Sequence, residues 1–203
     1  MRVLFQAPMA FVLAWAVPSI SPGGNPNEHG CATNSGAEQI ASCTAWIDGS
    51  ILGVDEMANA FYIRAGAYWD QKSYTRAIAD VSIVVRLRPK DPNAFKLRAD
   101  AYMMQNKFAL AVADYDKVIR LDPGMAMSFN NRGWAYYRLN KYALAVADYD
   151  AAIRRGARSA QAFYIRGLAK GKLGQSAASQ ADISQAIAID MNIAKEIAAV
   201  LGR

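Results

Sequence analysis

The sequence predicts an all-α protein, an α-solenoid of stacked helix-turn-helix units, and three observations carry this prediction. A phenylalanine recurs at a constant interval, an arginine follows each phenylalanine by three residues, and an aspartate follows each arginine by sixteen. A fixed period of about 34 residues indicates one supersecondary unit that is repeated and stacked along the chain. The three series are Phe61, Phe95, Phe129 and Phe163; Arg64, Arg98, Arg132 and Arg166; and Asp80, Asp114, Asp148 and Asp182.

The first residues are typical of an export signal. Met1 and Arg2 give a short positive start, residues 3–17 are mostly apolar, and Ala14-Trp15-Ala16 has the small-x-small pattern of a signal-peptidase site. We expect cleavage after Ala16, so that residues 1–16 are a signal peptide. An uncleaved anchor that faces the periplasm is the alternative, although the apolar stretch is shorter than the roughly 20 residues that span a bilayer.

Residues 17–36 are rich in Gly, Pro and Asn, and we expect them to form a flexible linker. The two cysteines of the chain, Cys31 and Cys43, lie just after the signal segment. In an oxidising compartment an even cysteine count favours a disulfide, here one that closes a loop of about 13 residues. Free thiols remain an alternative, whereas a metal site that includes His29 would lack a fourth ligand.

Both ends of the array are predicted to carry caps. Residues 37–57 are expected to hold one helix, a half-repeat in which Cys43 lies one period before Ala77. The disulfide would tie the preceding irregular segment to this helix in place of the missing partner helix. Residues 192–203 are expected to form a short amphipathic helix that covers the apolar edge of the last unit, as the ends of a solenoid require.

Four full units lie between the caps, at 58–91, 92–125, 126–159 and 160–191, and each reads as two helices. In the second unit an apolar face at helical spacing is interrupted at Asn106-Lys107 and resumes at Phe108, and Asp122-Pro123 ends the second helix. Small residues recur where the two helices must approach closely, and each Arg–Asp pair is expected to fix helix register rather than to bind a ligand. The small residues are Ala65, Ala99, Gly133 and Gly167 on the first helices and Ala77, Ala111, Ala145 and Ser179 on the second.

This unit resembles the tetratricopeptide repeat, most closely in the segments 129–136 and 142–149. The resemblance implies a superhelix whose concave groove is lined by first helices and binds a protein or peptide partner. It places the partner-binding side chains at outward positions of those helices. The alternative for individual aromatic members is that they fill the space between neighbouring helices. The predicted partner-binding residues are Tyr62, Trp69, Lys96, Asp100, Asn130, Trp134, Tyr137, Arg138 and Tyr164.

One family subtype, which clamps a C-terminal carboxylate with Lys, Asn and Arg side chains, is not expected here. Lys96 has Asp100 one turn away, and the matching places in other units hold Tyr62, Gly66 and Ile165. For the aromatic positions we expect Trp134→Ala combined with Tyr137→Ala to abolish partner capture with little change in thermal stability.

Charge and motifs exclude several function classes. The net charge of +6 is spread singly along the chain, so a nucleic-acid partner is not expected. The only histidine is His29, and no phosphate-binding loop or metal-binding motif occurs, so we expect no catalytic residues, metal or cofactor. The sequence therefore predicts a non-enzymatic binding scaffold of the bacterial cell envelope, periplasmic or secreted. A self-associating assembly factor, tethered to the membrane if the signal is retained, is the alternative.

Overall fold

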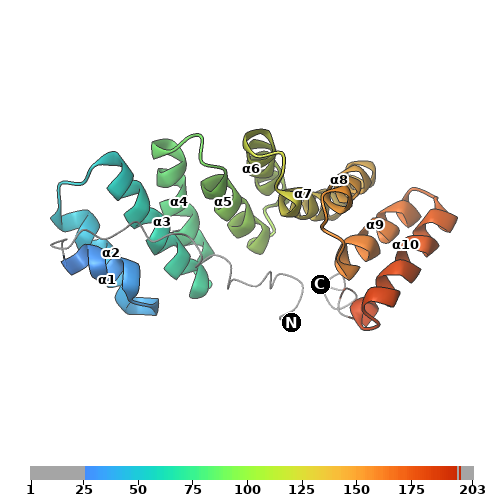
Figure 1. Ribbon diagram of the computed structural model, residues 1–203, viewed down its shortest axis with the longest axis horizontal. Helices are drawn as coiled ribbons and strands as arrows, with labels where there is room; N and C mark the ends of the chain where they lie inside the picture. The colour runs from blue at the N-terminus through green and yellow to red at the C-terminus, as the bar shows by residue number, and fades with distance from the viewer. Residues whose placement is uncertain (1–25, 196, 198–203) are drawn as a thin grey trace. The chain divides into compact units, whose positions relative to one another are not determined.

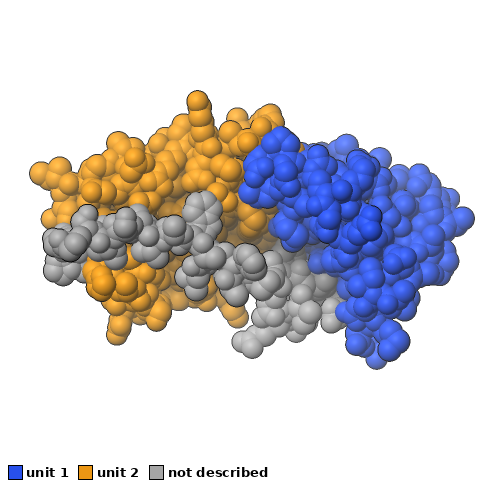
Figure 2. Space-filling model, viewed as in Figure 1, with its two compact units in different colours: residues 1–15, 122–203 blue, residues 16–121 orange. Residues whose placement is uncertain are grey.

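The computed structural model describes residues 26–195 and 197, and this part of the chain contains α-helices and no strand. It divides between Leu121 and Asp122 into two compact units, called here the N-terminal unit (26–121, orange in Figure 2) and the C-terminal unit (122–195 and 197, blue in Figure 2). The predicted signal peptide at 1–16 lies outside the described residues.

The N-terminal unit is built from three consecutive helix pairs (Figure 1). The helices of a pair pack on each other, and the second helix of one pair packs on the first helix of the next. The unit is therefore a stack of helix-turn-helix repeats, as predicted. Its helices are α1 (Pro26–Thr33), α2 (Gly36–Gly49), α3 (Val54–Asp70), α4 (Tyr74–Leu87), α5 (Pro92–Met104) and α6 (Phe108–Leu121).

The C-terminal unit contains two further pairs with the same internal packing, since α7 packs on α8, α8 on α9 and α9 on α10. Residues 193–195 and 197 are helical beyond the second pair, and Ile193 and Ile197 are buried. This is the region of the expected C-terminal cap, most of which lies outside the described residues. The helices are α7 (Ala126–Arg138), α8 (Tyr142–Arg154), α9 (Ala160–Lys172) and α10 (Ser176–Ile189).

The turn inside each full repeat depends on one residue with left-handed backbone geometry. Lys72, Asn106 and Asn140 have φ of 58°, 58° and 59°, and Gly174 has φ of 76°. These four residues follow one another at the repeat period, and each comes just after a first helix. A left-handed residue after a helix ends it and lets the chain reverse, and Gly and Asn adopt this geometry most readily.

The small residues bring the two helices of a repeat close together, as predicted. Ala65 and Ala77 are fully buried in α3 and α4. A Cβ added to Gly133 would lie 3.2 Å from the ring of Tyr149, and one added to Gly167 would lie 3.0 Å from the carbonyl oxygen of Ser179. A larger residue at these positions would force the helices apart.

The Arg–Asp series forms two-bond ion pairs within each repeat, from the first helix to the second. Arg64 donates to Asp80 through Nε at 2.8 Å and Nη2 at 2.9 Å. Arg98, Arg132 and Arg166 bind their aspartates in the same way, with distances of 2.6–2.8 Å. The Nη1 atoms of Arg64, Arg98 and Arg166 reach the preceding second helix, where they donate to Thr44, Ser82 and Asp150. The series thus joins helices within a repeat and links neighbouring repeats.

The predicted disulfide between Cys31 and Cys43 is present, and both cysteines are buried in an apolar cluster with Trp46 and Ala60. The flexible linker predicted at 17–36 is wrong for its second half, because residues 26–33 form α1. Its Gly, Pro and Asn content suggested an irregular segment, but packing against α2 and the disulfide override that weak local preference.

The next boundary also differs from the prediction. Helix α2 ends at Gly49, and α3 begins at Val54, inside the segment 37–57 that was predicted as the cap. The backbone N–H of Gly53 donates to Glu56 Oε2 at 2.9 Å, so the first turn of α3 is capped earlier than the repeat period suggests.

Candidate partner-binding surfaces

The predicted partner-binding residues fall on two separate surfaces, one in each unit. The α3–α5 surface of the N-terminal unit carries Tyr62, Trp69, Lys96 and Asp100. The α7–α9 surface of the C-terminal unit carries Asn130, Trp134, Tyr137, Arg138 and Tyr164. Equivalent positions are separated by whole repeat periods, so the chemistry of the two surfaces can be compared position by position.

The α3–α5 surface is organised around the carboxylate of Asp100. Lys96 Nζ donates to Asp100 Oδ2 at 2.7 Å, and the Tyr115 hydroxyl on α6 donates to Oδ1. The charge of Asp100 raises the pKa of Lys96 above its ordinary value despite partial burial of the ammonium. Burial, with added repulsion from Asp91 and Asp100, raises the pKa of Tyr62 to about 12. This surface therefore satisfies its charges internally.

Two consequences follow for the predicted ligand chemistry. Lys96 is paired with Asp100, so its ammonium is not free to bind the terminal carboxylate of a peptide. This agrees with the expectation that the chain has no carboxylate clamp. Trp69 packs edge-on against Tyr74, with ring centroids 5.2 Å apart, and both Trp69 and Tyr62 pack against the core of the unit. These aromatic side chains partly fill space between helices, which is the alternative that the sequence left open.

The α7–α9 surface is organised around an aromatic cluster. The rings of Trp134 and Tyr137 stack with centroids 5.7 Å apart, and Tyr142 meets Tyr137 edge-on at 5.6 Å. The guanidinium of Arg138 lies 5.5 Å from the Trp134 ring centroid, as in a cation–π contact. Burial raises the pKa of Tyr137, and the nearby Tyr142 and Tyr164 hydroxyls add to the shift.

Three of the predicted contact residues are much less exposed than expected. Asn130, Trp134 and Tyr137 are 5%, 3% and 9% exposed. Arg138 and Tyr164 are half-buried and remain reachable. Since Trp134 and Tyr137 belong to the packed interior, the expectation that their joint removal leaves thermal stability nearly unchanged does not fit the structure.

Sequence reasoning missed two residues that matter here, Tyr115 and Tyr149 on the second helices. They occupy the same position of successive repeats, but Tyr115 bonds to Asp100, whereas the residue one period after Asp100 is Trp134. Tyr149 Oη and Asn130 Oδ1 are buried, and the described residues provide no hydrogen-bond partner for either atom. Burial also raises the pKa of Tyr149 well above its ordinary value. Alignment of the repeats position by position would have found this difference.

The two units also differ in charge. Residues 26–121 contain eleven basic and eleven acidic side chains, whereas residues 122–203 contain eleven basic and six acidic ones. Helices α7 and α9 have no acidic residue, while α3 and α5 together have four. In the C-terminal unit, Asp148, Asp150 and Asp182 are hydrogen-bonded to arginines. The α7–α9 surface is therefore cationic and aromatic.

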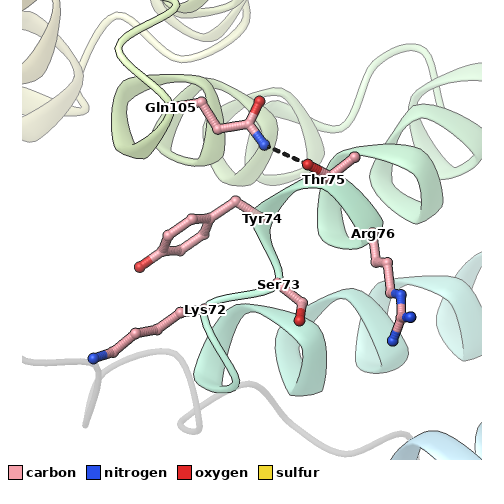
Figure 3. A pocket seen from close by; sticks show the side chains of 6 residues that line it. All are labelled: Lys72, Ser73, Tyr74, Thr75, Arg76 and Gln105. Atoms are coloured by element: carbon pink, nitrogen blue, oxygen red, sulfur yellow. Dashed lines mark hydrogen bonds between the residues drawn. The ribbon is translucent and has the colours of Figure 1, made fainter.

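An open hollow beside the α3–α4 turn is a further concave feature of the N-terminal unit (Figure 3). Gln105 Nε2 donates to Thr75 Oγ1 at 2.8 Å across it. The side chains of Lys72 and Tyr74 extend to one side and that of Arg76 to the other, so the three do not converge on one ligand.

Within the described residues, no three His, Cys, Asp or Glu side chains are grouped closely enough to hold a metal ion. None of the helices in the same part of the chain has both the length and the apolar character of a membrane-spanning helix.

Comparison with protein families identifies a repeat family. The tetratricopeptide repeat model matches residues 52–92, 64–126 and 130–178, which together make up more than half of the chain. Comparison with curated protein sequences gives no match.

Several solved structures share the fold. A structure described as the crystal structure of MamA is 16% identical, covers 85% of this chain and 98% of its own, and has a TM-score of 0.72. MamA from Desulfovibrio magneticus RS-1, residues 41 to the end, is 21% identical with a TM-score of 0.64, over 69% and 86% of the two chains. The first repeat domain of Spaghetti (RPAP3), bound to the HSP90 peptide SRMEEVD, is 24% identical with a TM-score of 0.56, over 59% and 94%. At these identities the likeness concerns the fold alone.

Proposed function

Because this chain belongs to the tetratricopeptide repeat family, we propose that it is a non-enzymatic scaffold that binds a protein or peptide partner, chiefly through its α7–α9 surface. Such repeats typically mediate protein–protein interaction. A peptide-bound neighbour, the RPAP3 domain with its HSP90 peptide, supports a peptide-binding role for this fold. The proposal places the protein in the oxidising bacterial envelope, periplasmic or secreted, and the buried disulfide supports this location.

The observation that carries the choice of surface is the contrast between the two units. Lys96, Asp100 and Tyr115 satisfy one another on the α3–α5 surface. At the equivalent positions the C-terminal unit has Asn130, Trp134 and Tyr149, and it keeps a buried acceptor oxygen on Asn130 without a partner in the described residues. The α7–α9 surface therefore has no equivalent of the Lys96–Asp100 ion pair.

The reachable part of this surface has the composition of a protein interface. Tyr164 and Arg138 are half-buried, and Tyr142 lies at the edge of the cluster. Tyr, Trp and Arg are the residue types that contribute most to binding at interfaces. The absence of acidic residues from α7 and α9 favours a segment that is not strongly basic.

Site-specific photo-crosslinking tests the proposal. A photoreactive phenylalanine analogue at Tyr164 should give a discrete adduct in the envelope of the producing bacterium. The same analogue at Leu144, which is 48% exposed on the second helix α8, should not. Equal adducts from both positions, or none from Tyr164, would contradict the proposal. An adduct of twice the chain mass would instead indicate self-association.

Matched substitutions separate the two surfaces. Tyr62 and Tyr164 occupy the same position of the first and last full repeats, and both are half-buried. Tyr164→Ala should reduce capture of the crosslinked partner at least tenfold, while Tyr62→Ala should leave capture unchanged. Intact mass of the exported protein would show whether residues 1–16 are removed.

A further inference from the structure

The disulfide joins the two positions at which every later repeat makes its closest helix–helix contact. Cys31 lies one repeat period before Ala65, and Cys43 lies one period before Ala77. The two cysteines are twelve residues apart, as are the paired small residues of each full repeat. The first-helix series is Cys31, Ala65, Ala99, Gly133 and Gly167, and the second-helix series is Cys43, Ala77, Ala111, Ala145 and Ser179.

The local geometry of the first and last repeats agrees with this alignment. In the last repeat, Ser179 Oγ donates to the carbonyl oxygen of Gly167 at 2.7 Å. In the first, Cys43 Sγ lies 3.7 Å from the carbonyl oxygen of Cys31. Helices α1 and α2 therefore pack like the first and second helices of a full repeat. They form an additional, shorter repeat in front of the four full ones, instead of the half-repeat expected from the sequence.

This first repeat lacks the ion pair of the others. The arginine position is taken by Gly30 and the aspartate position by Trp46. A Cβ at residue 30 would lie only 2.7 Å from Ser42 Oγ, so the close approach of α1 leaves no room for an arginine. Cys31 directly follows Gly30, the position that an arginine occupies in the other repeats. The disulfide therefore links the two helices in place of the ion pair.

Helix α1 is the shortest of helices α1 to α10 in the described residues, and it packs mainly on α2. It has 8 residues, whereas the first helices of the full repeats have 13 or 17. Gln39 Nε2 on α2 donates to the Cys31 carbonyl oxygen at 3.0 Å, and Asn34 Nδ2, one residue after α1, donates to Ser42 Oγ on α2 at 3.1 Å. A helix this short is not stable by itself, so its position depends on tertiary links.

We propose that the Cys31–Cys43 disulfide makes the first repeat a redox-dependent cap: the oxidised form holds α1 over Trp46 and Ala60, and the reduced form releases it. A dithiol reductant supplies two electrons and two protons. The S–S bond breaks, two thiols form on this chain, and the reductant becomes a disulfide. Both sulfurs are fully buried, so the reductant reaches them only during brief local opening of the oxidised form, and reduction then keeps α1 released.

Hydrogen exchange of the full chain, with and without dithiothreitol, tests the cap. Reduction should make the amides of α1 exchange at least tenfold faster, while the amides of α3 to α6 keep their rates. Unchanged α1 rates after complete reduction, verified by thiol counting, would overturn the proposal. Equal acceleration throughout residues 54–121 would also overturn it, because the disulfide would then support the whole unit.

A double substitution provides the matched control. Cys31→Ala with Cys43→Ala places at both positions the residue that the next two repeats already carry, so helix packing is preserved and only the covalent link is lost. This variant should show fast exchange in α1 with or without dithiothreitol. Slow α1 exchange in the variant would show that packing alone holds the helix and would contradict the proposal. Neither experiment depends on partner binding, so the cap can fail while the proposed function stands.

Discussion

The repeats α5–α6 and α7–α8 are neighbours in sequence and have the same kinds of residue at the positions that set the helix pairing, yet they differ around the positions of Asp100 and Tyr115. Both have the periodic Phe, Arg and Asp and the same left-handed turn residue, Asn. The first closes a network among Lys96, Asp100 and Tyr115, whereas the second leaves polar atoms of Asn130 and Tyr149 without partners in the described residues.

This difference separates positions that fix helix packing from positions that can vary between repeats. The shared positions fix register through buried ion pairs and small-residue contacts, and they vary little because each is surrounded by neighbouring helices. The positions that differ carry a salt bridge in one repeat and a buried tryptophan in the next. An incompletely satisfied polar site destabilises the fold and is expected where function requires it.

The largest expected effect comes from Trp134. It is 3% exposed in the aromatic cluster of the C-terminal unit, so Trp134→Ala should lower the free energy of unfolding by about 3–5 kcal/mol. Trp69 in the N-terminal unit is only partly buried, so Trp69→Ala should cost about half as much. Chemical denaturation of both variants measures the contrast. Equal losses would mean that the two tryptophans contribute alike to packing.

The second comparison uses the paired tyrosines. Tyr115→Phe removes a hydrogen bond to a carboxylate and should destabilise the protein by about 1.5–3 kcal/mol. Tyr149→Phe removes a buried hydroxyl that lacks a partner in the described residues, so the free energy of unfolding should stay the same or rise slightly. Denaturant midpoints of the two variants are the measurement. A large loss in Tyr149→Phe would show that this hydroxyl is bonded in solution.

The sequence predicted the repeating fold because its evidence is periodic. The Phe, Arg and Asp series fix both helices of four repeats, and the Arg–Asp pairs form within each repeat as their spacing of sixteen residues allows. The sequence predicted only half of the first repeat, because Gly30 and Trp46 replace the Arg–Asp pair that is present in the other repeats. Cys31 was the remaining signal, since it lies one period before Ala65.

The candidate site was less predictable because exposure depends on neighbours that a pattern does not specify. Trp134 and Tyr137 occupy outward helical positions by register, but stacking against each other and against Tyr142 buries them. The ion pair between Lys96 and Asp100 was predicted because the two residues are one helical turn apart. The role of Tyr115 was not, because it comes from another helix.

A smaller effect is expected at the turns. Lys72 has the left-handed geometry that Asn140 has at the same position two repeats later, with φ of 58° and 59°. Asn adopts this geometry more readily than Lys, so Lys72→Asn should stabilise the protein by about 0.5–1 kcal/mol. The reciprocal change Asn140→Lys should destabilise it by a similar amount. Thermal unfolding of both variants checks the pair, and shifts in the same direction would contradict it.

The smallest effect concerns Asp182, whose repeat has Lys170 where Tyr68, Tyr102 and Tyr136 stand. Burial alone would raise the pKa of Asp182, but hydrogen bonds from Arg166 and Lys170 outweigh burial and hold it below its ordinary value. A carboxyl with a lowered folded pKa stabilises the fold above its unfolded pKa, and that contribution is lost as pH falls through the folded value. Lys170→Met should therefore raise the pKa of Asp182 and start acid destabilisation at a higher pH. Carboxyl carbon NMR titration gives the shift directly. The exposed Lys172→Met is the control, and an equal shift in both variants would remove the specific role assigned to Lys170.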